Sequence, residues 1–205
     1  MSEKWNKLPD EATIEKATQA VKNRGIEVIR VKDRTEAMQK IKEILPRGAE
    51  LMTGGSTTLE EIGFTDLLKS GKHPYNNLKD KLFAEKDPQK QAELRRTSVT
   101  ANYFLGSVHA ISQNGEMVIA SASGSQLPSY TFSSPNVIWI AGAQKITKNL
   151  DEAMQRVREY VLPLEDARMK KEGYPGSTIG KLLIFEREVM PRKITLILVK
   201  EKLGF

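Results

Sequence analysis

The sequence has no cysteine, and His73 and His109 are the only histidines among its 205 residues. Without cysteine the chain cannot form disulfides, bind zinc or an iron–sulfur cluster through thiolates, or use a thiol as a nucleophile. Two histidines are also too few for a multi-histidine metal centre. We therefore predict a protein with no metal ion and no resident cofactor, and the lack of cysteine fits a reducing compartment.

Aromatic side chains and long apolar stretches are scarce as well. Aromatic residues make up 6% of the chain, too few for a platform on which bases stack, and the lysines and arginines are mixed with acids. The longest stretch of apolar residues and glycine, 137–143, cannot span a bilayer, and the charged first residues lack the apolar core of a signal peptide. The sequence thus predicts a cytoplasmic protein that binds neither nucleic acid nor membranes.

The remaining composition is that of a globular protein with an excess of positive charge. The 32 basic residues against 26 acidic ones give a net charge of +6. This excess favours anionic ligands, and we predict a small anionic metabolite as the partner. No linker divides the chain, so residues 1–205 are predicted to form a single domain with an N-terminal helix at about 10–23 packed on it.

Helix and strand patterns alternate along the chain. Apolar residues at helical spacing and capping residues predict helices at about 10–23, 33–46 and 149–163, the last two ending at a proline. Continuous apolar stretches at 26–31, 50–53 and 137–141 are typical of strands covered on both faces of a parallel sheet. The pattern predicts an α/β fold.

Two hairpins are expected to be inserted into this fold. Asn114-Gly115 separates two apolar strands and is a strong signal for a tight turn. A second hairpin is predicted to join 181–188 to 193–201. The polar segment 64–100 is predicted to be helical, with one helix starting at Asp87-Pro88.

The first candidate site is the loop after the predicted strand 50–53, which contains Gly54, Gly55, Ser56, Thr57 and Thr58. Adjacent glycines let the backbone approach a ligand closely, and hydroxyls and free N–H groups at a helix N-terminus favour an anion. The alternative is that Thr57 and Glu60 only cap the helix. We favour anion binding because two glycines exceed what a cap requires.

The second candidate site surrounds the Asn114-Gly115 turn. His109 can act as a general acid or base near neutral pH, and Glu116 can do the same as a carboxylate, so both are candidate catalytic residues. Ser107 and Asn114 are candidate ligand contacts. The alternatives are a strand histidine bonded to a neighbour, an exposed hairpin charge and a simple turn.

Two more loops of small and polar residues follow predicted strands. One contains Ser123, Gly124 and Ser125, and the other contains Gly142, Gln144 and Lys145. Open α/β sheets bind ligands at the carboxyl ends of their strands, so we predict that these residues contact the ligand. Lys145 would supply a positive charge to an anion; the alternative is a surface lysine.

Three stretches of the sequence resemble the LUD domain family, which is named for lactate utilisation: LMTGGSTTLEEIG, YFLGSVHAISQNGEMVIASASGSQ and VIWIAGAQKITKNLDEAMQRVREYVLPLEDAR. The resemblance implies a Rossmann-like three-layer α/β/α sandwich with a hairpin insertion. This is the fold of sugar-phosphate isomerases, methenyltetrahydrofolate synthetases and class I CoA transferases. The resemblance also implies a role in the oxidation of L-lactate to pyruvate, beside partner proteins that carry iron–sulfur clusters.

Three functions stay open at this point. The favoured one is a protein that binds a small anionic metabolite as a subunit or accessory of lactate oxidation. The second is a stand-alone isomerase or transferase acting on a phosphorylated or carboxylated small molecule through His109 and Glu116. The third is a non-catalytic subunit that binds a partner through the terminal helix and the charged segment 64–100. The residues do not decide whether the chain is an enzyme or forms a homo-oligomer.

Overall fold

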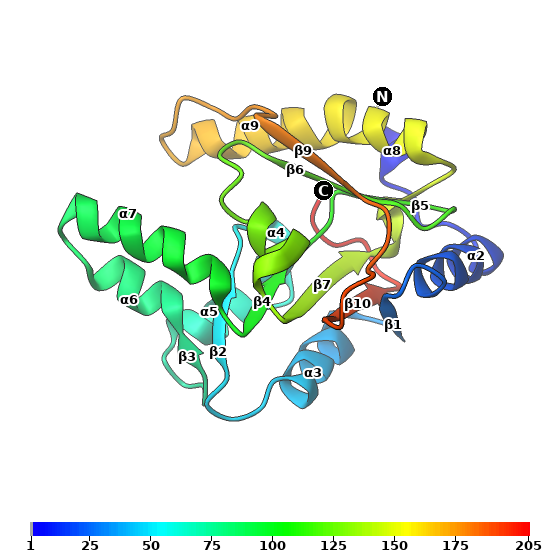
Figure 1. Ribbon diagram of the computed structural model, residues 1–205. Helices are drawn as coiled ribbons and strands as arrows, with labels where there is room; N and C mark the ends of the chain where they lie inside the picture. The colour runs from blue at the N-terminus through cyan, green and yellow to red at the C-terminus, as the bar shows by residue number, and fades with distance from the viewer. Residues whose placement is uncertain (1) are drawn as a thin grey trace.

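The computed structural model describes residues 2–205 (Figure 1). Its α-helices are α1 (Ser2–Trp5), α2 (Glu11–Lys22), α3 (Arg34–Ile44), α4 (Thr57–Glu61), α5 (Phe64–Lys69), α6 (Leu78–Ala84), α7 (Pro88–Thr97), α8 (Leu150–Arg156) and α9 (Leu162–Lys171). Short 3₁₀ or π segments are η1 (Ser98–Thr100), η2 (Ser129–Ser133), η3 (Ala143–Lys145) and η4 (Val157–Val161). Across the described residues, the helices are too short or too polar to cross a membrane.

Within residues 2–205, ten strands form two sheets. The strands are β1 (Glu27–Val31), β2 (Glu50–Thr53), β3 (Asn76–Asn77), β4 (Tyr103–Gly106), β5 (Ala110–Ser112), β6 (Met117–Ser121), β7 (Asn136–Gly142), β8 (Ile146–Thr147), β9 (Lys181–Phe185) and β10 (Lys193–Val199). The six-stranded central sheet has the order β1-β10-β7-β4-β2-β3, and its pairings are all parallel. The small sheet has the order β8-β5-β6-β9.

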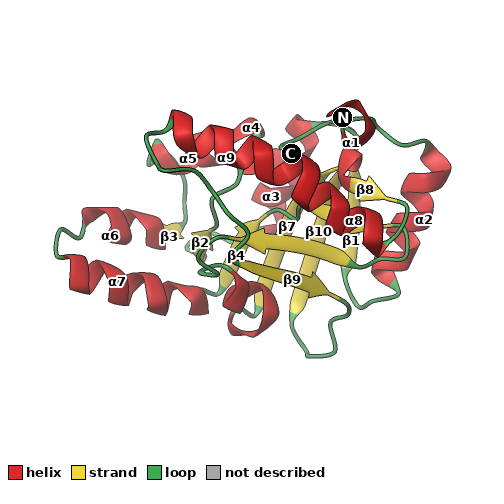
Figure 2. Cartoon of the chain, turned by 90° about the horizontal axis from the view of Figure 1, so that it is seen from above, coloured by secondary structure: helices red, strands yellow, loops and turns green. Residues whose placement is uncertain are grey.

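The central sheet is buried on both faces, as its continuous apolar strands predict. In β7, Trp139 and Ala141 point into one core, whereas Ile138 and Ile140 point into the other. Helices α3, α4 and α5 cover the second core, and α2, α6 and the small sheet cover the first. The result is a Rossmann-like three-layer α/β/α fold to which the small sheet is added (Figure 2).

The hairpin expected at Asn114-Gly115 is confirmed: β5 and β6 pair antiparallel, and Gly115 has a φ of 96° in the turn. The second hairpin is wrong. Strand β9 pairs with β6 in the small sheet, whereas β10 lies between β1 and β7 in the central sheet. Both segments are apolar and close in sequence, but a parallel position inside the central sheet buries both faces of β10, which a hairpin would not.

The predicted helix after Asn149 begins there but does not end at Pro163. Segments α8, η4 and α9 form one long helix that crosses the small sheet (Figure 2). Inside it, the N–H of Leu162 bonds the carbonyl of Val157, five residues back. Because this wider turn re-forms the helix at Leu162, Pro163 sits in a first turn, where its missing N–H costs little.

Asp33 caps α3, and we expect its replacement by alanine to cost about 1 kcal/mol of unfolding free energy. Its carboxylate accepts hydrogen bonds from the N–H groups of Thr35 and Glu36, both at 3.0 Å. Urea unfolding of the Asp33→Ala variant measures this loss. The exposed Thr35→Ala variant is the control and should change stability little; equal stability of both variants would contradict the cap.

Candidate functional site

A cavity of about 310 Å³ opens at the carboxyl ends of three neighbouring strands, β2, β4 and β7. The loops after these strands form its floor, and segments of the small sheet and of η4 and α9 form its walls. Because parallel strands end at one edge of the sheet, residues far apart in sequence meet here.

Lys145 lies at the closed end of this cavity, 2% exposed, in η3 directly after β7. Its Nζ donates to the Thr58 hydroxyl at 3.0 Å, to the Ser107 hydroxyl at 3.0 Å and to the Val108 carbonyl at 3.1 Å. One ammonium therefore joins the loops that follow β2, β4 and β7. No carboxylate of the described residues lies within 4.0 Å of it.

The surroundings of Lys145 lower the pKa of its ammonium to about 7. Burial is the largest cause, and the positive charge of Arg156 adds to it, whereas Glu61 opposes it. Lys145 is therefore a positive charge that loses its proton near neutral pH unless an anion stabilises it.

His109 lines the cavity from the segment between β4 and β5. Its Nδ1 accepts the N–H of Ala120 at 3.1 Å, so the ring proton lies on Nε2. Burial first, then the charges of Lys145 and Arg156, lower the pKa of His109 to about 3. The ring is thus neutral at physiological pH, and its geometry suits a hydrogen-bond donor through Nε2 rather than a general base.

Arg156 of α8 holds the His109 segment of the cavity wall in place. Its guanidinium is fully buried and donates to the carbonyl oxygens of His109 and Trp5. The α1 segment, the long helix and the cavity wall are therefore joined by one side chain.

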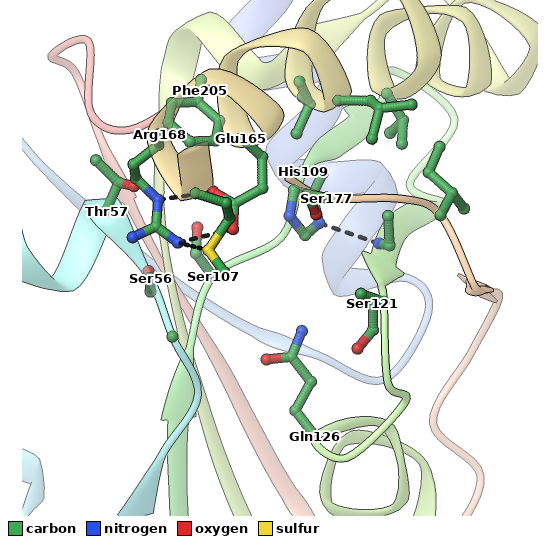
Figure 3. A pocket seen from close by; sticks show the side chains of 18 of the residues that line it. Ser56, Thr57, Ser107, His109, Ser121, Gln126, Glu165, Arg168, Ser177 and Phe205 are labelled. Carbon is green, nitrogen blue, oxygen red and sulfur yellow. Dashed lines mark hydrogen bonds and ion pairs between the residues drawn. The ribbon is translucent and has the colours of Figure 1, made fainter. Parts of the chain in front are cut away.

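The open side of the cavity carries an ion-paired arginine. Arg168 of α9 donates to both carboxylate oxygens of Glu165 at 2.7 and 2.8 Å, and to Glu172 at 2.7 Å. Figure 3 shows Arg168 and Glu165 beside Phe205 and Thr57. Because two carboxylates already neutralise Arg168, it contributes less free positive charge to the cavity than Lys145 does.

Nine of the predicted site residues line this cavity: Gly55, Ser56, Thr57, Thr58, Ser107, His109, Ser123, Ser125 and Lys145. Six others do not: Gly54, Asn114, Glu116, Gly124, Gly142 and Gln144. Gly54 lines an adjoining cavity instead. The structure thus brings the strand-end loops together and leaves the hairpin turn outside.

Glu116 and Asn114 are held away from the cavity by Arg24, at the end of α2. The Arg24 guanidinium pairs with the Glu116 carboxylate and donates to the Asn114 carbonyl at 2.8 Å. Burial opposes ionisation of Glu116, but hydrogen bonds from Ser112 and the charge of Arg24 leave its pKa below the ordinary value. Glu116 therefore acts as an anchor between the hairpin and α2.

Gly142 and Gln144 support the C-terminal segment rather than the cavity surface. The Gln144 amide donates to the carbonyls of Leu203 at 2.9 Å and Gly204 at 3.2 Å. Gly204 has a φ of 60°, and a Cβ there would stand 2.4 Å from the Thr58 hydroxyl, so the segment packs closely against the Lys145 cluster.

The cap of α4 is Ser56, whose hydroxyl accepts the Leu59 N–H at 3.3 Å, rather than Thr57. The helix has only five residues. A helix this short has a weak dipole, so the positive charge of the site comes mainly from Lys145.

Sequence reasoning missed the wall formed by the long helix and by the segment after it: Val157, Val161, Leu162, Glu165, Arg168, Met169, Gly176, Ser177, Thr178 and Ile179. It also missed Phe205 at the C-terminal end. The spacing of Val157, Val161, Glu165 and Arg168 could have indicated one continuous helical face. Ending the helix at Pro163 concealed it.

Comparisons with known proteins agree with this architecture. The family model of the LUD domain matches residues 14–199. A crystal structure of a DUF162 family protein from Deinococcus radiodurans superimposes with a TM-score of 0.58 and 11% sequence identity, covering 94% of this chain and 99% of that one. A search of curated proteins gives no match. The match covers most of the sequence, and the chain therefore belongs to the LUD domain family.

Proposed function

We propose that this protein binds a small 2-hydroxy or 2-oxo carboxylate, with lactate and pyruvate as the first candidates, as an accessory subunit of lactate oxidation. The observation that supports this is the buried ammonium of Lys145, which contacts two hydroxyls and one carbonyl. A buried charge without a counter-charge is costly. A ligand carboxylate at this end of the cavity would supply the counter-charge.

The rest of the cavity suits the other groups of such an acid. The Nε2 proton of neutral His109 and the hydroxyls of Ser56 and Ser107 can donate to an oxygen on the second carbon. Val157 and Ile179 offer an apolar wall for a methyl group. Hydrogen-bonding side chains beside a small apolar wall suit a short acid with several oxygens and one methyl group.

In this proposal, the chain binds the acid that is oxidised. Oxidation of lactate to pyruvate removes two electrons and two protons, and in this proposal partner proteins accept the electrons. The support for this role is the family's general link to lactate utilisation. Binding of the acid by the isolated chain is the part that can be tested directly.

We expect lactate and pyruvate to bind more tightly at pH 6 than at pH 9. The pKa of Lys145 is about 7, so its ammonium is mostly protonated at pH 6 and mostly neutral at pH 9. Since the ligand stays anionic throughout, the affinity should fall by roughly 100-fold, about tenfold for each pH unit above 7. Calorimetry at both pH values measures this, and at pH 8 binding should take up a proton from the buffer.

The Lys145→Met variant should lose this binding, and Lys148→Met, which removes an exposed lysine three residues later, should keep it. Lactamide, which lacks the negative charge, should bind neither protein. Equal affinity at pH 6 and pH 9, or unchanged binding by Lys145→Met, would refute the assignment of the carboxylate to Lys145.

A further inference from the structure

Two further cavities adjoin the main one. An inner cavity of about 170 Å³ shares Gly55, Ser125 and Gln126 with it. An outer cavity of about 620 Å³ shares Arg95, Val99 and Ser125 with the inner one. All three therefore meet around Ser125. The inner and outer cavities form one groove beside the α6–α7 pair, which projects from the β2–β3 side of the central sheet (Figure 1).

This groove carries positive charge only. Lys79 and Arg95 line the inner cavity, Arg95 and Arg96 line the outer one, and neither lining contains an aspartate or glutamate. Among the described residues, these three cations have no carboxylate within 4.0 Å. The feature of this groove is therefore that three cations line it together and that no acidic residue lies among them.

Lys79 is the most enclosed of the three. Its Nζ donates to the Gly54 carbonyl, at 3.3 Å, where the chain leaves β2. Burial lowers the pKa of its ammonium, with Lys69 acting in the same direction and Glu60 opposing. An ammonium has three donors, and this contact uses one, so the others are available to a ligand.

Arg95 of α7 adds a different kind of donor to the lining of the inner cavity. A guanidinium presents a planar fork of donors that matches the oxygens of a phosphate. Met52, Leu82 and Phe104 form an apolar floor below these charges. Two or three cations around one short groove favour a group with more than one negative charge over a single carboxylate.

We propose that this groove is a second subsite, for a phosphate or diphosphate group, and that it continues the main cavity so that one elongated ligand can occupy both. The subsite is separate from Lys145 and does not depend on which acid binds there. It goes beyond the proposed function because lactate and pyruvate are too short to reach it. A natural ligand would carry a carboxylate at one end and a phosphate-type group at the other.

The test is calorimetric binding of inorganic diphosphate at 150 mM salt, where weak surface attraction is largely screened. The wild-type protein should bind it. The variants Lys79→Met and Arg95→Gln should each lose at least tenfold in affinity. Lys81→Met, on the exposed side of α6, and Arg187→Gln, an exposed arginine outside these cavities, are matched controls and should stay within twofold of wild type. Arg95 is exposed, so its variant tests the site without disturbing the core.

Further measurements separate this subsite from the main cavity. Lys145→Met should bind diphosphate as well as wild type, and saturating lactate should not compete. Absence of diphosphate binding would overturn the subsite, as would a loss in Lys145→Met while Lys79→Met and Arg95→Gln bind normally. Equal losses of affinity in the control variants would show that diphosphate binding depends only on the net charge of the protein. That result would also overturn the subsite. None of these results depends on whether lactate binds.

Discussion

Replacing Lys145 with methionine should make the protein more stable at pH 6 and less stable at pH 9 relative to wild type. The pKa of about 7 in the folded protein is lower than the ordinary value of 10.5 for a lysine side chain. Between these values the unfolded chain holds a proton that the folded protein has released, so the free energy of unfolding of wild type rises with pH across this window. Below pH 7, Lys145 is protonated in both the folded and the unfolded state. The buried charge then lowers the free energy of unfolding by its full amount.

The stability difference between the two proteins should change by roughly 3 kcal/mol from pH 6 to pH 9, at about 1.4 kcal/mol per pH unit above 7. Methionine has nearly the same length and removes the charge, but it leaves the Val108 carbonyl without its donor, which costs about 1–3 kcal/mol at every pH. Urea unfolding at both pH values measures the difference. Lys148→Met should follow wild type throughout, and a pH-independent difference for Lys145→Met would show that Lys145 does not titrate in this range.

Replacing Gly106 with alanine should destabilise the protein by about 3 kcal/mol or more, through overpacking. Gly106 ends β4, and a Cβ on it would stand 1.8 Å from the Tyr130 hydroxyl oxygen. The Tyr130 ring cannot move aside easily, because it lies edge to face against Phe104 at 5.3 Å and Trp139 at 5.5 Å between ring centroids. Thermal or urea unfolding of the variant gives the loss.

A second substitution identifies the cause. Tyr130→Phe removes the oxygen and should cost about 1 kcal/mol alone. In the double variant, Tyr130→Phe should recover about 2 kcal/mol of the stability that Gly106→Ala loses. The nearest remaining ring atom, Cζ, is then 3.0 Å from the alanine Cβ. Gly55→Ala, where a Cβ meets nothing within 4 Å, should leave stability nearly unchanged. A double variant no more stable than Gly106→Ala would mean that the clash with the hydroxyl is not the source of the loss.

Local patterns were sufficient to predict most elements of the central layer. The cap at Asp33, the proline at the start of α7 and the Asn114-Gly115 turn are determined by a few neighbouring residues. The partners of β9 and β10 could not be predicted in this way. They depend on which apolar faces remain to be covered after the rest of the chain has folded, and β10 completes a sheet whose other strands come from distant parts of the sequence.

The candidate site also has a part that local sequence patterns predict and a part that they do not. The loops after β2, β4 and β7 were predictable because parallel strands end at one edge. The burial of Lys145 was not, since lysine is mostly a surface residue and its three acceptors come from Thr58, Ser107 and Val108. The ion pair between Arg24 and Glu116 joins residues 92 positions apart. No rule of sequence spacing predicts such a pair.

The position of β10 between β1 and β7 has a consequence for synthesis on the ribosome. Glu27 of β1 bonds Thr195 of β10, 168 residues later. Strand β1 therefore emerges long before its neighbour exists, and the position between β1 and β7 stays empty while most of the chain is being translated. Contacts this distant in sequence slow folding. Until β10 has left the exit tunnel, the apolar edges of β1 and β7 are exposed, and chaperones would have their main opportunity to bind the nascent chain then.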